Sequence, residues 1–250
     1  MTMLEGCILT QIGQFAELVP EEKALLLDLE KDPKRYAAET CLCAAGEEAE
    51  RFYTLSSGWA CAVRDLADGR RQVLDIFLPG QILGLREMGF NEARSDFVAL
   101  TDIEACPFPR TRLTEVFEQA PRLASLFFLI LAREQSMLVE RIINIGRRPA
   151  AERLAHFILE MKVRLQRPSH EVRLPMNQSV LADALGMSAV HVSRSFSQLR
   201  KRDLIRTDGG AIWIHDMEGL VRFSGFNRAY LDCEANWVSR TDPVCMGEAS

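Results

Sequence analysis

The stretch QSVLADALGMSAVHVSRSFSQLRKRDLI, residues 178–205, constrains the fold more than any other part of the chain. Its apolar residues recur at helical spacing on both sides of Gly186, which indicates two short helices separated by a sharp turn. Asn177 and Ser188 each precede one of these runs, where a side-chain oxygen can cap the free N–H groups of a helix. The sequence therefore predicts a tight pair of helices.

The two faces of the second predicted helix, which begins at residue 189, differ in chemistry. Val192, Phe196 and Leu199 lie four and three residues apart and are expected to face the core. The opposite face is expected to carry Ala189, Val190, Ser193, Arg194 and Ser197. Taken alone, the two helices fit either a solvated amphipathic hairpin or a helix-turn-helix that reads DNA.

Features beside the two helices favour the DNA-reading alternative. Two short β-like runs, LIRT and AIWIH, follow the second helix and are joined by Asp208-Gly209-Gly210. The chain has a net charge of −5, but residues 150–223 hold 11 Lys and Arg against 8 Asp and Glu, a net charge of +3. A local basic patch matters more for phosphate binding than the charge of the whole chain. We therefore predict a winged helix-turn-helix.

A recognition helix presents its N-terminal residues to base edges in the major groove. Arg194 can donate two hydrogen bonds to guanine O6 and N7. The residues expected to lie at the bases are Ala189, Val190, Ser193 and Arg194. Contacts to backbone phosphates position a protein without specifying sequence, and the residues expected to make them are Asn177, Gln178, Ser179, His191, Ser197, Lys201 and Arg206.

The N-terminal part changes from helical to β-like periodicity. Residues 9–31 are predicted to be helical, with Pro20 near a helix start. From about residue 35 to 110, short β-like runs are separated by turn signals such as Asp68-Gly69. Many short strands with regular turns predict a compact β-barrel or roll rather than βαβ units.

A long helix is predicted from Pro121 to Gly146, followed by a boundary at Arg147-Arg148-Pro149. It could pack only within its own subunit. Because it is apolar on more than one face, we favour a seam between two copies of the chain. The expected seam residues, of which three repeat every seven positions, are Phe127, Leu131, Leu138, Ile142 and Ile145.

These segments together resemble the Crp/Fnr family of bacterial transcription regulators over about residues 10–230. LADALGMSAVHVSRSFSQLRKRDLI resembles the DNA-binding signature of that family, and GEEAERFYTLSSGWACAV, DGRRQVLDIFLPGQILGL and ARSDFVAL resemble its β-roll. The resemblance implies a homodimer that places one helix of each subunit into the major groove of a palindromic operator in double-stranded DNA. It also implies contact with RNA polymerase.

An α+β chain of four parts is therefore expected. Residues 1–120 form a cyclic-nucleotide-binding-like β-roll of jelly-roll type, 121–148 the dimerisation helix, and 149–225 the winged helix-turn-helix. Residues 226–250 form a C-terminal extension whose last ten or so residues are expected to be disordered. No apolar run reaches the ~18 residues that cross a membrane, and MTMLEGCILT lacks the pattern of a secretory signal. We expect a cytoplasmic protein.

The resemblance also predicts that the effector pocket is vestigial. Family members that bind cyclic nucleotides use a Gly-Glu pair for the ribose and an Arg-Ser/Thr-Ala run for the phosphate. Here Leu85 follows Gly84, and Asp96, which would repel an anion, follows Arg94-Ser95. The pocket is expected at Gly84, Leu85, Arg94 and Ser95, with Leu138 and Val139 where polar residues would reach the purine. Binding of cAMP is not expected.

No metal or cofactor is predicted. The seven cysteines form no CxxC pair, and we favour small buried apolar residues over redox or metal ligands. Only Cys7 precedes residue 41, so the N-terminal iron–sulfur cluster of the Fnr branch is not expected, and no His is assigned as a ligand. The chief rival to a regulator is a module that binds a cyclic nucleotide or other small ligand in signalling without acting on DNA. An enzyme is not expected, since no GxSxG, Walker, HExxH or Rossmann pattern occurs.

Overall fold

The computed structural model describes residues 7–166, 168–233 and 238, and its first large unit is a β-roll of two four-stranded antiparallel sheets. The first sheet has the order β1 (Lys34–Tyr36), β8 (Ile103–Pro109), β3 (Arg51–Ser57), β6 (Ile82–Leu83). The second has the order β2 (Cys41–Cys43), β7 (Asp96–Ala99), β4 (Ala60–Asp65), β5 (Arg71–Phe77). Buried side chains of both sheets, such as Leu55 and Phe97, form one core. The predicted β-roll is confirmed.

Glycines with left-handed backbone make two of its turns possible. Gly69 has φ of +81° in the hairpin between β4 and β5, a region that residues with a Cβ rarely adopt. Gly58 has φ of +78°, and a Cβ there would lie 2.3 Å from the Asp102 carbonyl oxygen. The β3–β4 turn therefore requires glycine both for its backbone angle and for space.

Two short helices precede the β-roll where a single helical region over residues 9–31 was predicted. Helix α1 spans Cys7–Gly13 and α2 spans Pro20–Asp28. The prediction was wrong about the segment between them. Proline lacks an N–H and fits the first turn of a helix, so Pro20 opens α2 and cannot lie in the interior of a longer helix.

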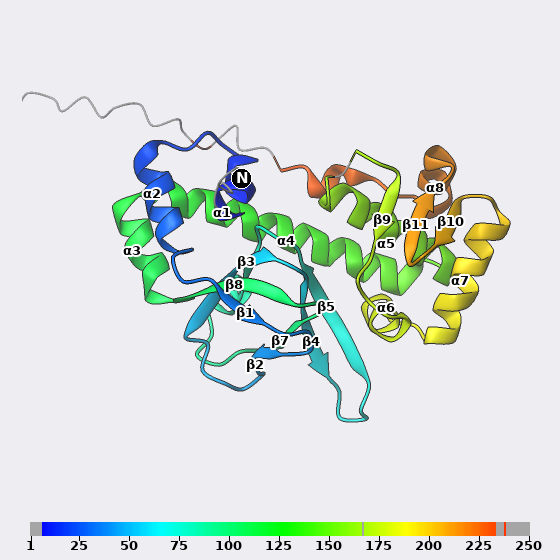
Figure 1. Ribbon diagram of the computed structural model, residues 1–250, viewed down its shortest axis with the longest axis horizontal. Coiled ribbons are helices and arrows are strands. Elements are labelled where there is room, and N and C mark those ends of the chain that lie inside the picture. The colour runs from blue at the N-terminus through cyan, green and yellow to red at the C-terminus, as the bar shows by residue number, and fades with distance from the viewer. Residues whose placement is uncertain (1–6, 167, 234–237, 239–250) are drawn as a thin grey trace, which may run out of the picture.

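Helix α4 (Pro121–Arg147) follows α3 (Thr111–Gln119) and runs across the β-roll, as Figure 1 shows. The chain then turns at Arg148-Pro149 into α5 (Ala150–Arg164). This turn is held by Glu140, whose Oε1 accepts a hydrogen bond of 2.7 Å from Arg148 and lies 3.1 Å from Nε2 of the buried His156. The direction of α5 relative to α4 is therefore fixed by side chains as well as by the backbone.

The C-terminal unit contains helices α6 (Gln178–Leu185), α7 (Ala189–Lys201) and α8 (Met217–Ser224). Its three-stranded sheet has the order β10 (Ile205–Asp208), β11 (Ala211–Ile214), β9 (Glu171–Arg173). Two elements of this unit, β9 and α8, were not predicted. A 3₁₀ helix, η2 (Arg228–Leu231), follows, and the residues expected to be disordered at the chain end lie outside the described part.

The β-roll and the C-terminal unit pack directly on each other. Trp59, Val63 and Val73 of the roll belong to the same buried apolar cluster as Leu154 of α5 and Leu185 of α6. At the edge of this contact, the Gln72 side-chain amide donates a 2.7 Å hydrogen bond to the Asp183 carbonyl of α6. The C-terminal unit is thus docked against strands β4 and β5 of its own subunit.

Candidate nucleic-acid interface

Helix α6 begins and ends where the sequence places its signals. Asn177 Oδ1 accepts a 2.9 Å hydrogen bond from the Val180 N–H, which caps the N-terminus. Gly186 ends the helix with φ of +58°, and its left-handed backbone turns the chain towards α7. Leu181 and Leu185 are buried beneath the turn, so α6 supports the helix that follows.

Helix α7 is anchored on one face and exposed on the other. Ser188 Oγ caps it by accepting a 3.3 Å hydrogen bond from the His191 N–H. Val192 and Leu199 are fully buried, and α5 packs across this side of the helix. The third predicted core residue, Phe196, is half-buried at the edge of the cluster. The orientation of α7 is therefore fixed by packing on its inner face.

The outer face of α7 carries the residues predicted to read bases. Val190 is 58% exposed. Ser193 and Arg194 are exposed, whereas Ala189 is half-buried. Within the described chain, the Arg194 guanidinium makes no hydrogen bond or ion pair. This face therefore presents the two methyl groups of Val190 and, one turn further on, the unpaired N–H donors of the Arg194 guanidinium.

Most of the residues predicted to bind phosphate are exposed. Gln178, Ser179, His191, Lys201 and Arg206 are exposed, and Ser197 is half-buried. His191 Nδ1 lies 2.9 Å from Ser188 Oγ, so its ring is held beside the cap. The exposed Asn177 uses one oxygen for capping and keeps its amide N–H groups.

Other basic residues nearby are engaged within the unit. Arg200 donates a 3.2 Å hydrogen bond to Thr207 of β10, and the Arg202 guanidinium lies 4.8 Å from the centroid of the Phe223 ring. Arg206 lies over Trp213 at 5.8 Å. The first contact joins α7 to the wing, the β10–β11 hairpin whose tip is Gly209-Gly210. The second joins the end of α7 to α8, and the third lies within the wing. Lys201, at the end of α7, remains directed to solvent.

The exposed face of α4 differs from the predicted seam by about one residue. Its members alternate at spacings of four and three residues: Phe128, Ala132, Gln135, Val139, Ile142 and Gly146. Phe128 and Ile142 are each 63% exposed, and Val139 is 47% exposed. This spacing is typical of a helix face that packs on a second helix.

Of the five predicted seam residues, only Ile142 lies on this exposed face. Phe127 is wrong as a seam residue, because it is buried in its own subunit with its ring 5.1 Å from that of Phe117. Leu131 packs partly against the same N-terminal core, Leu138 is half-buried, and Ile145 lies against Gly186. Successive residues of a helix point about 100° apart. A shift of one residue in the predicted stripe therefore moves it to a different face of α4.

The pocket of the β-roll that was predicted to be vestigial holds a carboxylate of the chain itself. Glu87, at the end of the 3₁₀ helix η1 (Leu85–Glu87), is 5% exposed. It accepts a 3.0 Å hydrogen bond from the Arg94 backbone N–H and a 3.1 Å bond from the Ser95 hydroxyl. Arg94 and Ser95 are the residues that the resemblance assigns to a ligand phosphate. Sequence reasoning missed Glu87, since nothing in the order of residues shows that it folds back onto Arg94-Ser95.

The cysteines are mostly shielded thiols. Cys61 and Cys106 are buried, and burial raises the pKa of Cys61 to about 12. Burial likewise raises the pKa of the half-buried Cys43 to about 11. Cys41 is exposed, so the expectation of burial was wrong at that position. Among the described residues, no group of three or more His, Cys, Asp or Glu is placed to hold a metal ion.

The fold and this surface define a class of protein: a DNA-binding regulator that joins a cyclic-nucleotide-binding-like β-roll to a winged helix-turn-helix. Comparison with known proteins agrees. The family model for the Crp-like helix-turn-helix domain matches residues 152–223, and the model for the cyclic nucleotide-binding domain matches residues 33–120.

The relatives belong to one family. The transcriptional activatory protein AadR of Rhodopseudomonas palustris is 31% identical over 174 residues, which cover 68% of this chain and 72% of AadR. The nitrogen fixation regulation protein FixK of Bradyrhizobium diazoefficiens is 32% identical over 168 residues, 66% of this chain and 70% of FixK. The solved structure of FixK2 from Bradyrhizobium japonicum has a TM-score of 0.72 at 27% identity and covers 77% of this chain and 96% of that one.

The chain belongs to the Crp/Fnr family of transcription regulators. It is a sequence-specific DNA-binding regulator of a type that acts as a homodimer on palindromic sites. Members of this family are regulators rather than enzymes. In the described chain, no helix is both long enough and apolar enough to cross a membrane.

Proposed function

We propose that α7 of each subunit enters the major groove of a palindromic operator and reads it with Ala189, Val190, Ser193 and Arg194. The observation that carries this proposal is the unpaired Arg194 beside the exposed Val190, on a helix whose opposite face is buried. Arginine donates two hydrogen bonds to guanine, and an apolar side chain packs on the thymine methyl. The expected half-site therefore contains a guanine and a neighbouring thymine.

Phosphate contacts hold the helix in this register. In the proposal they come from Asn177, Gln178, Ser179, His191, Ser197, Lys201 and Arg206. Of these, the exposed Lys201 at the end of α7 contributes charge without a base contact, because the N-terminal part of a recognition helix meets the bases. Its loss should weaken binding to all sequences alike.

The dimer is proposed to form along the exposed face of α4. Two copies of Phe128, Val139 and Ile142 would cover one another, which removes the largest exposed apolar side chains of the helix from water. A two-fold axis along this seam relates the two α7 helices and matches the symmetry of a palindrome. We also propose that the protein contacts RNA polymerase and acts in the cytoplasm. We propose no catalytic activity for it.

A binding selection from a random DNA library tests the proposal. The wild-type protein should enrich a palindrome with a guanine in each half-site, and Val190→Glu should change the preferred base beside that guanine. Leu66→Glu, a change at an exposed apolar residue in the β4–β5 turn, is the matched control and should leave the enriched sequence unchanged. Recovery of no common sequence by the wild type would refute the proposal and favour a signalling module without DNA function.

A further inference from the structure

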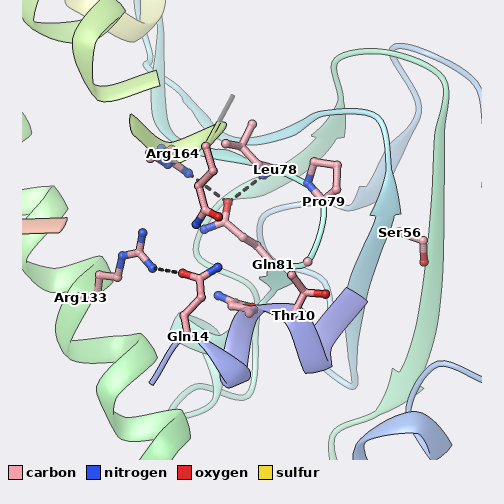
Figure 2. Close-up of a pocket in the computed structure, with 11 residues that line it drawn as sticks. Thr10, Gln14, Ser56, Leu78, Pro79, Gln81, Arg133 and Arg164 are labelled. Carbon is pink, nitrogen blue, oxygen red and sulfur yellow. Dashed lines mark hydrogen bonds between the residues drawn. The ribbon is translucent and has the colours of Figure 1, made fainter. Parts of the chain in front are cut away.

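A cavity of about 250 Å³ with several polar side chains in its wall lies where α1, the β-roll, α4 and α5 meet (Figure 2). Its wall includes Gln11 and Gln14 of α1, Gln81 of the turn before β6, Arg133 of α4 and Arg164 of α5. The four residues of the vestigial nucleotide pocket do not line this cavity. It is therefore a separate site from the one that the β-roll of this family provides.

Arg133 brings to this cavity a positive charge that no carboxylate of the described residues pairs with. One of its terminal N–H groups donates a 3.3 Å hydrogen bond to Gln14, while its buried Nε has no hydrogen-bond partner. Within the described residues, no carboxylate forms an ion pair with it. The nearby Asp232 is held by Arg228 through hydrogen bonds of 2.8 and 2.9 Å. Since a buried cation without a partner is costly, an anion would be favoured here.

A second arginine, Arg164, also lines the site. Its guanidinium is held by Glu160 at 3.3 Å and by Gln81 at 3.0 Å, and Figure 2 draws it above Arg133. Burial, followed by the proximity of Arg164, lowers the pKa of Arg133. Glu160 neutralises Arg164, so the charge still to be matched is that of Arg133.

Besides a negative charge for Arg133, a ligand needs a group that matches Gln11. It is only 7% exposed, and its Oε1 atom is buried without a hydrogen-bond partner in the described chain. This atom can only accept, so the complementary group is a donor such as a hydroxyl or an amine. The unmatched guanidinium of Arg133 would repel an ammonium, so a hydroxyl is the favoured donor.

We propose that this cavity binds a small hydroxycarboxylate, whose carboxylate pairs with Arg133 and whose hydroxyl donates to Gln11 Oε1. Arginine matches a carboxylate through two parallel hydrogen bonds, which favours this anion over a spherical one. The volume lies below the ~300–1,000 Å³ typical of sites for drug-sized ligands, so a nucleotide is too large.

The position of the cavity suggests a regulatory consequence, which rests on the proposed function. Arg133 lies on α4, whereas Arg164 ends α5, the helix that packs across α7. A ligand between them would bind best in one arrangement of the DNA-binding unit and would bias the chain towards it. Operator affinity should then change with ligand concentration.

Calorimetric titration of the full chain with L-lactate tests the site. Propionate, which lacks only the hydroxyl, should bind about tenfold more weakly, as expected when a buried polar group is left unpaired. Inorganic phosphate should bind more weakly than lactate. Arg133→Gln should abolish lactate binding, and Gln11→Leu should fold normally but bind lactate and propionate equally. Arg94→Gln, in the vestigial pocket, is the matched control and should bind lactate as the wild type does.

Several results would overturn the proposal. One is a wild type that fails to bind lactate, and another is a wild type that binds propionate as tightly as lactate. Loss of lactate binding in Arg94→Gln together with its retention in Arg133→Gln would also overturn it. For the regulatory step, lactate should shift operator affinity of the wild type at least threefold and leave that of Arg133→Gln unchanged. Unaltered affinity with intact lactate binding would refute the coupling alone. Failure of the wild type to bind any operator would instead count against the proposed function.

Discussion

The exposed face of α4 makes a quantitative prediction for Ile142→Lys. Fully burying an isoleucine side chain contributes about 1.5–3 kcal/mol. Ile142 is 63% exposed in the single chain and would be covered once in each subunit of a dimer. The two copies together therefore contribute about 2–4 kcal/mol. Because each 1.4 kcal/mol is tenfold, the substitution should raise the dimer dissociation constant by about 30- to 1,000-fold.

Sedimentation equilibrium over a wide range of concentrations measures this change directly. The matched control is Leu66→Lys, since Leu66 is also apolar and 44% exposed but lies in the turn between β4 and β5. The control should remain as dimeric as the wild type. Circular dichroism melting should show that both variants are folded, because neither side chain is buried. A dimer of wild-type affinity in Ile142→Lys would refute the seam along Phe128, Val139 and Ile142.

Four further outcomes follow from the structure. Arg194→Ala should weaken specific binding by about 1–3 kcal/mol and erase one guanine from the selected sequence; an unchanged sequence would remove Arg194 from the reading face. Lys201→Ala should lower the slope of log affinity against log salt by about one unit and leave specificity intact, which a salt titration measures. Millimolar cAMP should change neither melting temperature nor operator affinity, because Glu87 already accepts from the Arg94 backbone N–H and the Ser95 hydroxyl; a tenfold shift would contradict this. Burial, and then the nearby Asp75, raise the pKa of Glu134 from 4.5 to about 8, so the stability that the proton provides is present below pH 4.5 and lost as pH rises through 8. Glu134→Gln should remove this loss, at most about 5 kcal/mol, and a wild type equally stable to urea at pH 6 and pH 9 would exclude it.

The helix-turn-helix could be predicted almost completely because its signals are local. Capping by Asn177 and Ser188 and the left-handed turn at Gly186 depend on residues within one or two turns. The exposure of Val190 and Arg194 follows from the helical period once Val192 is placed in the core. Helix α8, by contrast, is short and comes directly after a strand, so its period was not recognised.

The face of α4 could not be assigned from its sequence, because apolar residues surround the helix. Leu123, Phe127 and Ile130 fill the core of the subunit, while Phe128 and Ile142 are left exposed. Sequence alone gives no way to rank these stripes, since both are apolar at helical spacing. Which stripe is buried depends on which side of α4 packs against the rest of the subunit. The contact of Glu87 with Arg94-Ser95 is hidden for the same reason, because it depends on how a loop folds back across the roll.

A single turn of α4 connects the functions of the molecule. Val139 and Ile142 lie on the exposed seam, Glu140 binds Arg148 at the start of the DNA-binding unit, and Arg141 donates to the Leu74 carbonyl of β5. Successive residues of a helix point about 100° apart, so residues 139–142 must face three different bodies at once. A rotation of α4 that improves one contact necessarily changes the others. The proposed dimer seam, the β-roll and the orientation of α7 are therefore mechanically linked through this turn.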